Sequence, residues 1–165
     1  MEEMLDVVDE NDKVVAVKSK SEVMRRALLH RGVVVFVFDS KNRIFVHKRT
    51  ASRKIYPGMW HLAVGGSVQS GESFDEAAKR EITEEIGVKN PRPKYLFSSR
   101  YKSEIDNVIA QIYRLTHDGA VVIQKEELER GSFITIAQLR KELLEKKFCP
   151  DALQYYHEME ERGLL

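Results

Sequence analysis

The most informative segment of the chain spans residues 66–88 and reads GSVQSGESFDEAAKREITEEIGV. Ser73 stands three residues before Glu76, which is the spacing of a capping box, where a hydroxyl and a carboxylate satisfy free amides at a helix start. The helix is therefore expected to begin just after Ser73 and to run to Ile86. Gly87 then ends it, because glycine readily takes the left-handed conformation found at helix C-termini.

The acidic side chains of this expected helix fall on one face. At 100° per residue, Glu81, Glu84 and Glu85 lie within a single arc of about 100°. Ala77 lies inside the same arc and adds almost no bulk, so the three carboxylates surround a shallow notch. The neighbouring sector is apolar and is expected to pack on a sheet; it consists of Ala78, Ile82 and Ile86.

Such a notch is either a solvated acidic face or a metal site. The like-charge pair Glu81 and Glu85, four residues apart, destabilises a helix by ~0.2–0.5 kcal/mol. Arg80 is not expected to relieve this repulsion, because it lies beside Glu84 on the helical wheel. A hard cation between the two carboxylates would relieve the repulsion, and oxygen-rich sites that keep water suit Mg²⁺ or Mn²⁺. These ions neutralise phosphate oxygens and activate water, so the notch indicates metal-dependent phosphate chemistry.

The same residues resemble a known motif, the Nudix box. Seven of its positions specify one residue type, and these seven at this spacing would occur by chance in the chain with odds of about one in ten million; the other two, Ile82 and Val88, require an apolar residue. The resemblance implies hydrolysis of a nucleoside diphosphate linked to another moiety, with water attacking one phosphorus. Every defining position of the box is filled: Gly66, Glu72, Arg80-Glu81-Ile82, Glu84-Glu85 and Gly87-Val88.

The resemblance implies roles for the box residues. Glu84 and Glu85 are expected to bind the divalent metal, Mg²⁺ or Mn²⁺. Glu81 is either a third ligand or the base that helps to deprotonate the attacking water. The carbonyl oxygen of Gly66 is expected to complete the metal site from the loop before the helix.

Further residues are candidates on the same grounds. Arg80 is expected to orient the Glu81 carboxylate by a charge-assisted contact, and Glu72 to close the site on the substrate side. Outside the box, Arg49 and Lys48 end a strand and are candidates for holding a diphosphate. Glu127 precedes Phe133, where many Nudix enzymes carry an additional catalytic carboxylate. Weaker candidates are the loop residues Arg53 and Lys54, and Tyr101 or Tyr113 as platforms for a base.

A wider resemblance, over residues ~1–150, is to the Nudix subgroup related to isopentenyl-diphosphate isomerase. The residues that carry it are Asp6–Glu10, Ser21–Val23, Leu29–Arg31, Lys48-Arg49 and Tyr56–Trp60. An isomerase is therefore the alternative function. That family uses a cysteine before the box and histidine metal ligands, but Gly65 stands at the cysteine position and Ser67 at one histidine position. Met24 stands near another, and only His30 matches.

A third alternative is a non-catalytic nucleotide-sensing Nudix module. Such modules generally lose metal carboxylates and accompany a DNA-binding segment. Here the three helix glutamates remain and no basic flanking segment is present. Hydrolysis is therefore preferred to both the isomerase and the sensor.

The remaining elements predict an α/β (α+β) fold, a Nudix-type α/β/α sandwich with a mixed sheet and an N-terminal β-hairpin extension. We expect residues 1–28 to form the extension and residues 29–165 the hydrolase domain. Gly32–Phe38 is continuously apolar, as in a strand buried on both faces, and Arg43–Arg49 alternates as a half-buried strand. The other expected strands are Leu5–Val8, Val14–Val17, Trp60–Val64, Lys94–Tyr101 and Asn107–Leu115. The other expected helices are one from Ser21 to Ala27, one capped by Thr135 and ending at Lys147, and one from Pro150 to Arg162.

The composition excludes several classes of protein. The 165 residues carry 27 basic and 26 acidic side chains, a net charge of +1, which argues against a nucleic-acid or polybasic membrane binder. One cysteine, Cys149, excludes an internal disulfide, and we assign it no catalytic role. The acidic N-terminus is unlike a signal peptide, and the longest apolar run, Val33–Phe38, is too short for a bilayer. We therefore expect a cytoplasmic enzyme with a small-molecule substrate, and a homodimer is an option through the hairpin at 4–18 or the last helix.

Overall fold

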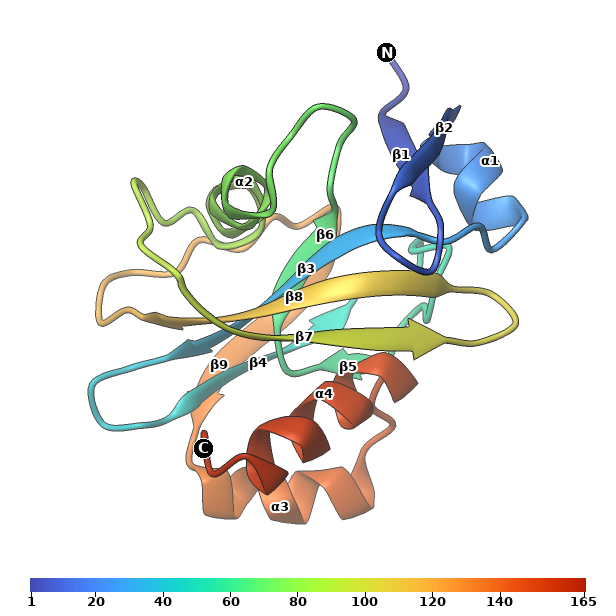
Figure 1. Cartoon of the computed structure of the whole chain (residues 1–165). Coiled ribbons are helices and arrows are strands. Elements are labelled where there is room, and N and C mark those ends of the chain that lie inside the picture. Colours follow the sequence, from blue (N-terminus) through green and yellow to red (C-terminus); the bar gives the residue numbers. More distant parts are fainter.

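The sheet at the centre of the molecule carries helices on both sides (Figure 1), and the computed structural model describes all residues, 1–165. Nine strands form this sheet: β1 Met4–Val8, β2 Val14–Ser19, β3 His30–Phe38, β4 Ile44–Arg49, β5 Trp60–His61, β6 Val64–Ser67, β7 Lys94–Lys102, β8 Asn107–Thr116 and β9 Leu128–Ile134. The helices are α1 Lys20–Arg25, α2 Phe74–Ile86, α3 Ile136–Glu145 and α4 Pro150–Glu161. This confirms the expected mixed α+β fold. None of these helices has both the length and the apolar character that a membrane crossing requires.

Strand β3 is the organising strand. It pairs in parallel with β8 along its whole length and antiparallel with β1, β4 and β6. Its continuous apolar sequence is buried on both faces, as predicted. Strands β7 and β8 form a long antiparallel pair, and β4 continues the sheet to β5 and β9.

Two cores lie on opposite faces of this sheet. Helix α2 covers the face of Val33 and Val35 and buries its predicted apolar sector there. Helices α3 and α4 cover the opposite face, where Phe36 and Phe38 pack. Strand β4 contributes to both cores, Phe45 to one and Val46 to the other. The prediction of a half-buried strand was therefore wrong for its first four residues, because helices cover both of its faces.

The N-terminal hairpin β1–β2 joins the sheet beside β3, where Val7 opposes His30. Helix α1 follows it directly. The helix is capped by Ser19 and ends at Arg25, so the prediction of a helix from Ser21 to Ala27 was two residues too late at its end.

Helix α2 has the predicted ends. The Ser73 hydroxyl accepts a hydrogen bond from the Glu76 amide at 3.2 Å, and the Glu76 carboxylate accepts one from the Ser73 amide at 2.9 Å. Gly87 takes the left-handed conformation, with φ 69°, and its amide bonds to the Thr83 carbonyl. The strong caps hold the helix in one register over the sheet, so its acidic face is fixed as well.

The prediction of one strand over Trp60–Val64 was wrong. Trp60–His61 pairs with β4, whereas Val64–Ser67 pairs with β3, and the chain crosses between the two strands at Leu62 and Ala63. Two histidine side chains form hydrogen bonds with the backbone of Ala63 at this crossing. His47 Nε2 donates to the Ala63 carbonyl at 2.8 Å, and the Ala63 amide donates to His61 Nδ1 at 3.0 Å. Strand β9 was not predicted at all.

Candidate functional site

Strand β6 places glycine directly beneath the acidic face of α2. A Cβ atom on Gly66 would lie 2.5 Å from Oε1 of Glu81 and 2.7 Å from its Cδ. Only a residue without a side chain therefore lets the Glu81 carboxylate lie against the strand. Since Gly66 pairs with Val33 of the organising strand β3, the Glu81 carboxylate lies against a strand that is hydrogen-bonded into the sheet.

Arg80 is held by five polar contacts. Its Nε and Nη2 donate to the two oxygens of Glu72 at 2.8 and 2.9 Å, and Nη2 also donates to the Ser67 carbonyl at 3.0 Å. Its Nη1 donates to Glu81 at 2.6 Å and to Glu84 at 3.3 Å. The arginine therefore ties the loop before α2 to the acidic face of the helix, and both oxygens of Glu72 are engaged by it.

The three helix glutamates differ in their surroundings. Glu81 and Glu85 are buried, with 8% and 5% of their surface exposed, whereas 51% of the Glu84 side chain is exposed at the outer rim. Burial raises the pKa of Glu81 to about 6, against the opposing effect of Arg80. Burial also raises the pKa of Glu85 well above its usual value, and the charges of Glu81 and Glu127 act in the same direction.

This donor set suits a divalent cation. Two buried carboxylates that repel each other are destabilised as anions, and a hard cation between them restores the charged form of both. Carboxylate and carbonyl oxygens are the ligands that Mg²⁺ prefers. Glu81 and Glu85 lie one turn apart on the buried side of α2, with Gly66 directly beneath Glu81, whereas Glu84 lines a separate surface depression together with Arg80.

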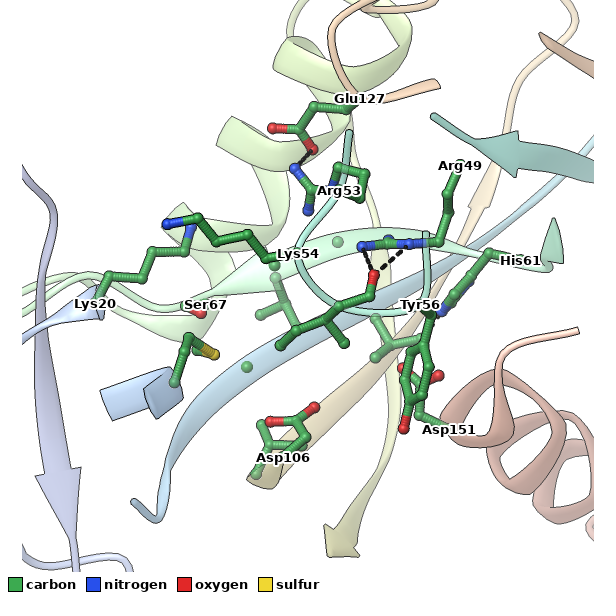
Figure 2. Close-up of a pocket in the computed structure, with 18 of the residues that line it drawn as sticks. Lys20, Arg49, Arg53, Lys54, Tyr56, His61, Ser67, Asp106, Glu127 and Asp151 are labelled. Carbon is green, nitrogen blue, oxygen red and sulfur yellow. Dashed lines mark hydrogen bonds and ion pairs between the residues drawn. The ribbon is translucent and has the colours of Figure 1, made fainter. Parts of the chain in front are cut away.

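A cavity of about 1140 Å³ opens beside Glu85 and Gly66. Figure 2 shows basic side chains from the loop after β4 on one side of it and Asp106 and Asp151 on another. The volume is far larger than a diphosphate group needs, so the cavity has room for the moieties on both sides of it. Its wall draws on segments far apart in the sequence, including Lys20 of α1 and Tyr56 of the loop after β4.

Two of the basic candidates line this cavity and are already engaged by the loops. Arg49 donates from Nε and Nη2 to the Ile55 carbonyl at 3.1 and 2.8 Å, which curls the loop around the guanidinium. Arg53 pairs with Glu127 at 2.8 Å and so joins this loop to the loop before β9. Glu127 also lies near Glu85, whose pKa it raises.

The structure does not bring every candidate to the cavity. Lys48 points to the opposite face of β4 and pairs with Glu129 at 3.3 Å. Tyr113 is buried beneath α2, where its hydroxyl donates to Asp75. Tyr101 does not line the cavity; its hydroxyl contacts that of Tyr56 at 2.8 Å and its ring packs edge-on against Tyr155, both of which do.

Several lining residues were not singled out from the sequence. They include Asp106 from the β7–β8 turn, Asp151 and Tyr155 from α4, and Lys20 and Arg25 from α1. No local pattern marks them, since each becomes a lining residue only through the packing of its element around the open end of the sheet. Lys54, a weaker candidate in the sequence, does line the cavity.

Comparisons with known proteins place the chain in one family. The NUDIX domain family matches residues 28–158. The chain is 40% identical over 157 residues to the uncharacterized Nudix hydrolase SCO1686 of Streptomyces coelicolor, covering 94% of this chain and 87% of that protein. It is 29% identical over 162 residues to isopentenyl-diphosphate Delta-isomerase 1 of Aromatoleum aromaticum, covering 96% and 90%.

A solved structure shows the same fold. The crystal structure of DR0079 from Deinococcus radiodurans superposes with a TM-score of 0.83 at 24% sequence identity, covering 94% of this chain and 98% of that one. The family match spans most of the chain and includes the whole box on α2. The protein therefore belongs to the Nudix hydrolase family, enzymes that act on phosphoric anhydride bonds.

Proposed function

We propose that the protein is a metal-dependent pyrophosphohydrolase that cleaves the diphosphate linkage of a small nucleoside diphosphate derivative. The observation that carries the proposal is the buried carboxylate of Glu85 in the wall of a large cavity that also holds Arg49 and Arg53, with the buried Glu81 one helical turn away on α2. Acidic groups for a cation and basic groups for phosphate oxygens thus share one site.

Glu84, Glu85 and the Gly66 carbonyl would hold Mg²⁺ or Mn²⁺. When bound, the ion supplies charge neutralisation on the phosphate oxygens and lowers the pKa of a coordinated water. Glu81 then has two roles open to it, as ligand or as base. Arg80 holds the buried Glu81 carboxylate in a fixed direction, and a carboxylate fixed in this way beside the proposed ion is placed to accept a proton from water, which supports the base role.

Arg80 acts as a positioning residue in this proposal. Its contact with Glu81 fixes the direction of the carboxylate, and its two bonds to Glu72 prevent the guanidinium from swinging away. We assign Glu72 this supporting role, and direct substrate contact is left to Arg49 and Arg53. Glu127 is a further candidate for binding metal or water once Arg53 pairs with phosphate instead.

The isomerase alternative is disfavoured by the space around Gly65. A Cβ atom at this position would collide with the backbone carbonyl of Val33, so a cysteine there needs the strand to shift. The cysteine of the chain, Cys149, is buried and lies outside the cavity lining. No thiol is therefore available beside the box for proton transfer to a carbon–carbon double bond.

The direct test is a panel of nucleoside diphosphate derivatives incubated with Mg²⁺ or Mn²⁺, with mononucleotide and phosphate products measured. We expect at least one member to be hydrolysed, and the activity to vanish in chelator and return with added metal. Hydrolysis that persists in chelator would reject the mechanism. Incubation with isopentenyl diphosphate serves as the second arm, and a double-bond isomer as product would favour the isomerase instead.

A further inference from the structure

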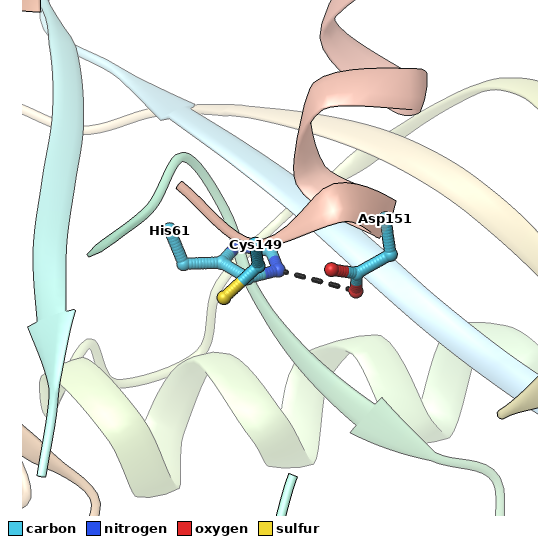
Figure 3. A group of neighbouring side chains, drawn as sticks. All are labelled: His61, Cys149 and Asp151. Carbon is cyan, nitrogen blue, oxygen red and sulfur yellow. Dashed lines mark hydrogen bonds and ion pairs between the residues drawn. The ribbon is translucent and has the colours of Figure 1, made fainter. Parts of the chain in front are cut away.

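The junction between β5 and α4 brings together three side chains that the hydrolase site does not use. Two backbone hydrogen bonds fasten this junction: the Trp60 amide donates to the Lys147 carbonyl at 2.9 Å, and the Cys149 amide donates to the Trp60 carbonyl at 2.8 Å. As a result, ligand atoms of His61, Cys149 and Asp151 lie within 4.8 Å of one another (Figure 3).

The hydrogen bonds of this cluster are incomplete. One Asp151 oxygen, Oδ2, meets His61 Nε2 at 3.4 Å, a long contact, while the other, Oδ1, is buried and has no partner. The Cys149 side chain is fully buried and makes no capping bond at the start of α4. A buried carboxylate oxygen without a partner is costly, and a cation is one way to satisfy it.

We propose that His61, Cys149 and Asp151 form a second metal site, separate from the carboxylates of α2, that binds Zn²⁺ or a similar thiophilic divalent ion. A thiolate, an imidazole and a carboxylate are the three ligand types of zinc sites, whereas Mg²⁺ sites are built from oxygen alone. The ligand chemistry therefore separates this site from the acidic notch, which suits a hard cation.

The distances need only a small closure. Around a zinc ion with bonds of 2.0–2.3 Å, tetrahedral ligands lie about 3.3–3.8 Å apart. The most distant ligand atoms must therefore approach by about 1–1.5 Å from the present limit of 4.8 Å, a movement on the scale of a side-chain torsion. His61 and Asp151 also line the large cavity, through which water or a ligand oxygen would complete the coordination of the ion.

Metal binding also moves protons in a defined way. Because His61 Nδ1 accepts a hydrogen bond from the Ala63 amide, the proton of the neutral ring sits on Nε2, toward Asp151. Coordination through Nε2 requires this proton to shift to Nδ1, with the loss of the Ala63 bond, and requires the Cys149 thiol to release its proton to solvent. One proton thus leaves the protein for each ion bound.

The test uses Co²⁺ as a spectroscopic substitute for Zn²⁺ in the full-length protein. We expect a sulfur-to-Co²⁺ charge-transfer band in the near ultraviolet at one equivalent, and about one Zn²⁺ per chain after gel filtration by elemental analysis. Cys149→Ser should abolish the band, and His61→Gln and Asp151→Asn should weaken Zn²⁺ retention at least tenfold. The matched control is Glu84→Gln with Glu85→Gln, which should keep both the band and the Zn²⁺.

Three outcomes would overturn the proposal. The first is a wild-type protein that shows no charge-transfer band with excess Co²⁺, a result that does not depend on any variant folding. The second is equal Zn²⁺ retention in the wild type and in a folded Asp151→Asn variant, whose shape is conserved. The third is loss of the band in the α2 control. Hydrolysis is not read out in any of these arms, so they are independent of the proposed function.

Discussion

Replacing Gly66 by alanine tests the closeness of β6 and α2 with a single methyl group. The added Cβ would lie 2.5 Å from the Glu81 carboxylate, whereas ordinary contacts begin at 3.4 Å, so the carboxylate must retreat by about 0.9 Å. Gly66 does not occupy the left-handed region, so the backbone accepts alanine without strain. A displacement of about 1 Å in a catalytic group can cost about 10²-fold in rate. We therefore expect kcat to fall by about 10²-fold. We also expect the unfolding free energy to fall by about 1–3 kcal/mol because the added methyl group overpacks this contact.

The assay is metal-dependent phosphate release, with thermal unfolding measured in parallel. Gly119→Ala is the matched control, because its Cβ would meet only the half-buried His117 ring, at 2.8 Å, a similarly close contact outside the candidate site. This control should keep full activity. The carbonyl of residue 66 is present in both glycine and alanine, so a lost metal ligand does not explain a loss of rate. If Gly66→Ala hydrolysed its substrate at the wild-type rate, the inference that Glu81 must lie against the strand would be refuted.

Four other perturbations follow from the contacts described. The double variant Glu84→Gln with Glu85→Gln should lose at least ~10³-fold in turnover, because it removes two proposed metal ligands. It should melt at or above the wild-type temperature, because it also removes mutually repelling charges. Undiminished phosphate release under saturating Mg²⁺ would contradict the site. Arg80→Lys should lower kcat by about 10–10²-fold, since a lysine cannot reproduce the forked contacts, and a wild-type rate would argue against a positioning role. Burial lowers the pKa of His47 to about 3, whereas the unfolded chain titrates near 6.5. Between these values only the unfolded state takes up this proton, so stability should fall as the pH drops below about 6.5, by up to ~1.4 kcal/mol per pH unit, and His47→Gln should flatten that part of a denaturation series. Ser73→Ala should cost about 1 kcal/mol in unfolding free energy through the lost cap, with little change in KM.

The fold was predictable where local signals were complete. Helix α2 has a capping box at one end and a glycine stop at the other, and both ends lie where the sequence predicts. Strand β3 was predictable because a continuous apolar run needs cover on both faces. These elements carry their own boundary signals, so no knowledge of distant partners was required.

Strand β9 lacked such signals. Its sequence, LERGSFI, is largely polar, and most of its residues are exposed. It is a strand because β4 offers it a hydrogen-bonding edge more than 70 residues earlier in the chain, and because Gly131 leaves room for the ring of Phe45. The break between β5 and β6 depends in the same way on His47, whose ring takes the Ala63 carbonyl from the sheet. Tertiary contacts of this kind are not visible in a local window.

The residues of the candidate site also differ in whether a local sequence pattern predicts them. The acidic face of α2 could be predicted because helical geometry alone places its glutamates together. For Lys48 and Arg49, strand alternation already implied opposite faces, and only Arg49 faces the cavity. Both residues were predicted to hold a diphosphate because the alternation of side chains along the strand was not applied to this basic pair. Which face opens on the cavity was set by the loops, and their path was not predictable.

Substrate choice must therefore depend on parts of the chain outside the box. The box supplies Gly66 and Glu85 to the cavity wall, whereas α1 supplies Lys20 and Met24 to it. The β7–β8 turn supplies Asp106, and α4 supplies Tyr155. A substrate that fills the cavity must contact these elements, whose residues can change without disturbing α2 or its caps. The chemistry of cleavage and the identity of the leaving group are thus held by separate segments, and variants of α1 that alter KM between substrates while leaving metal binding unchanged are the expected consequence of that separation.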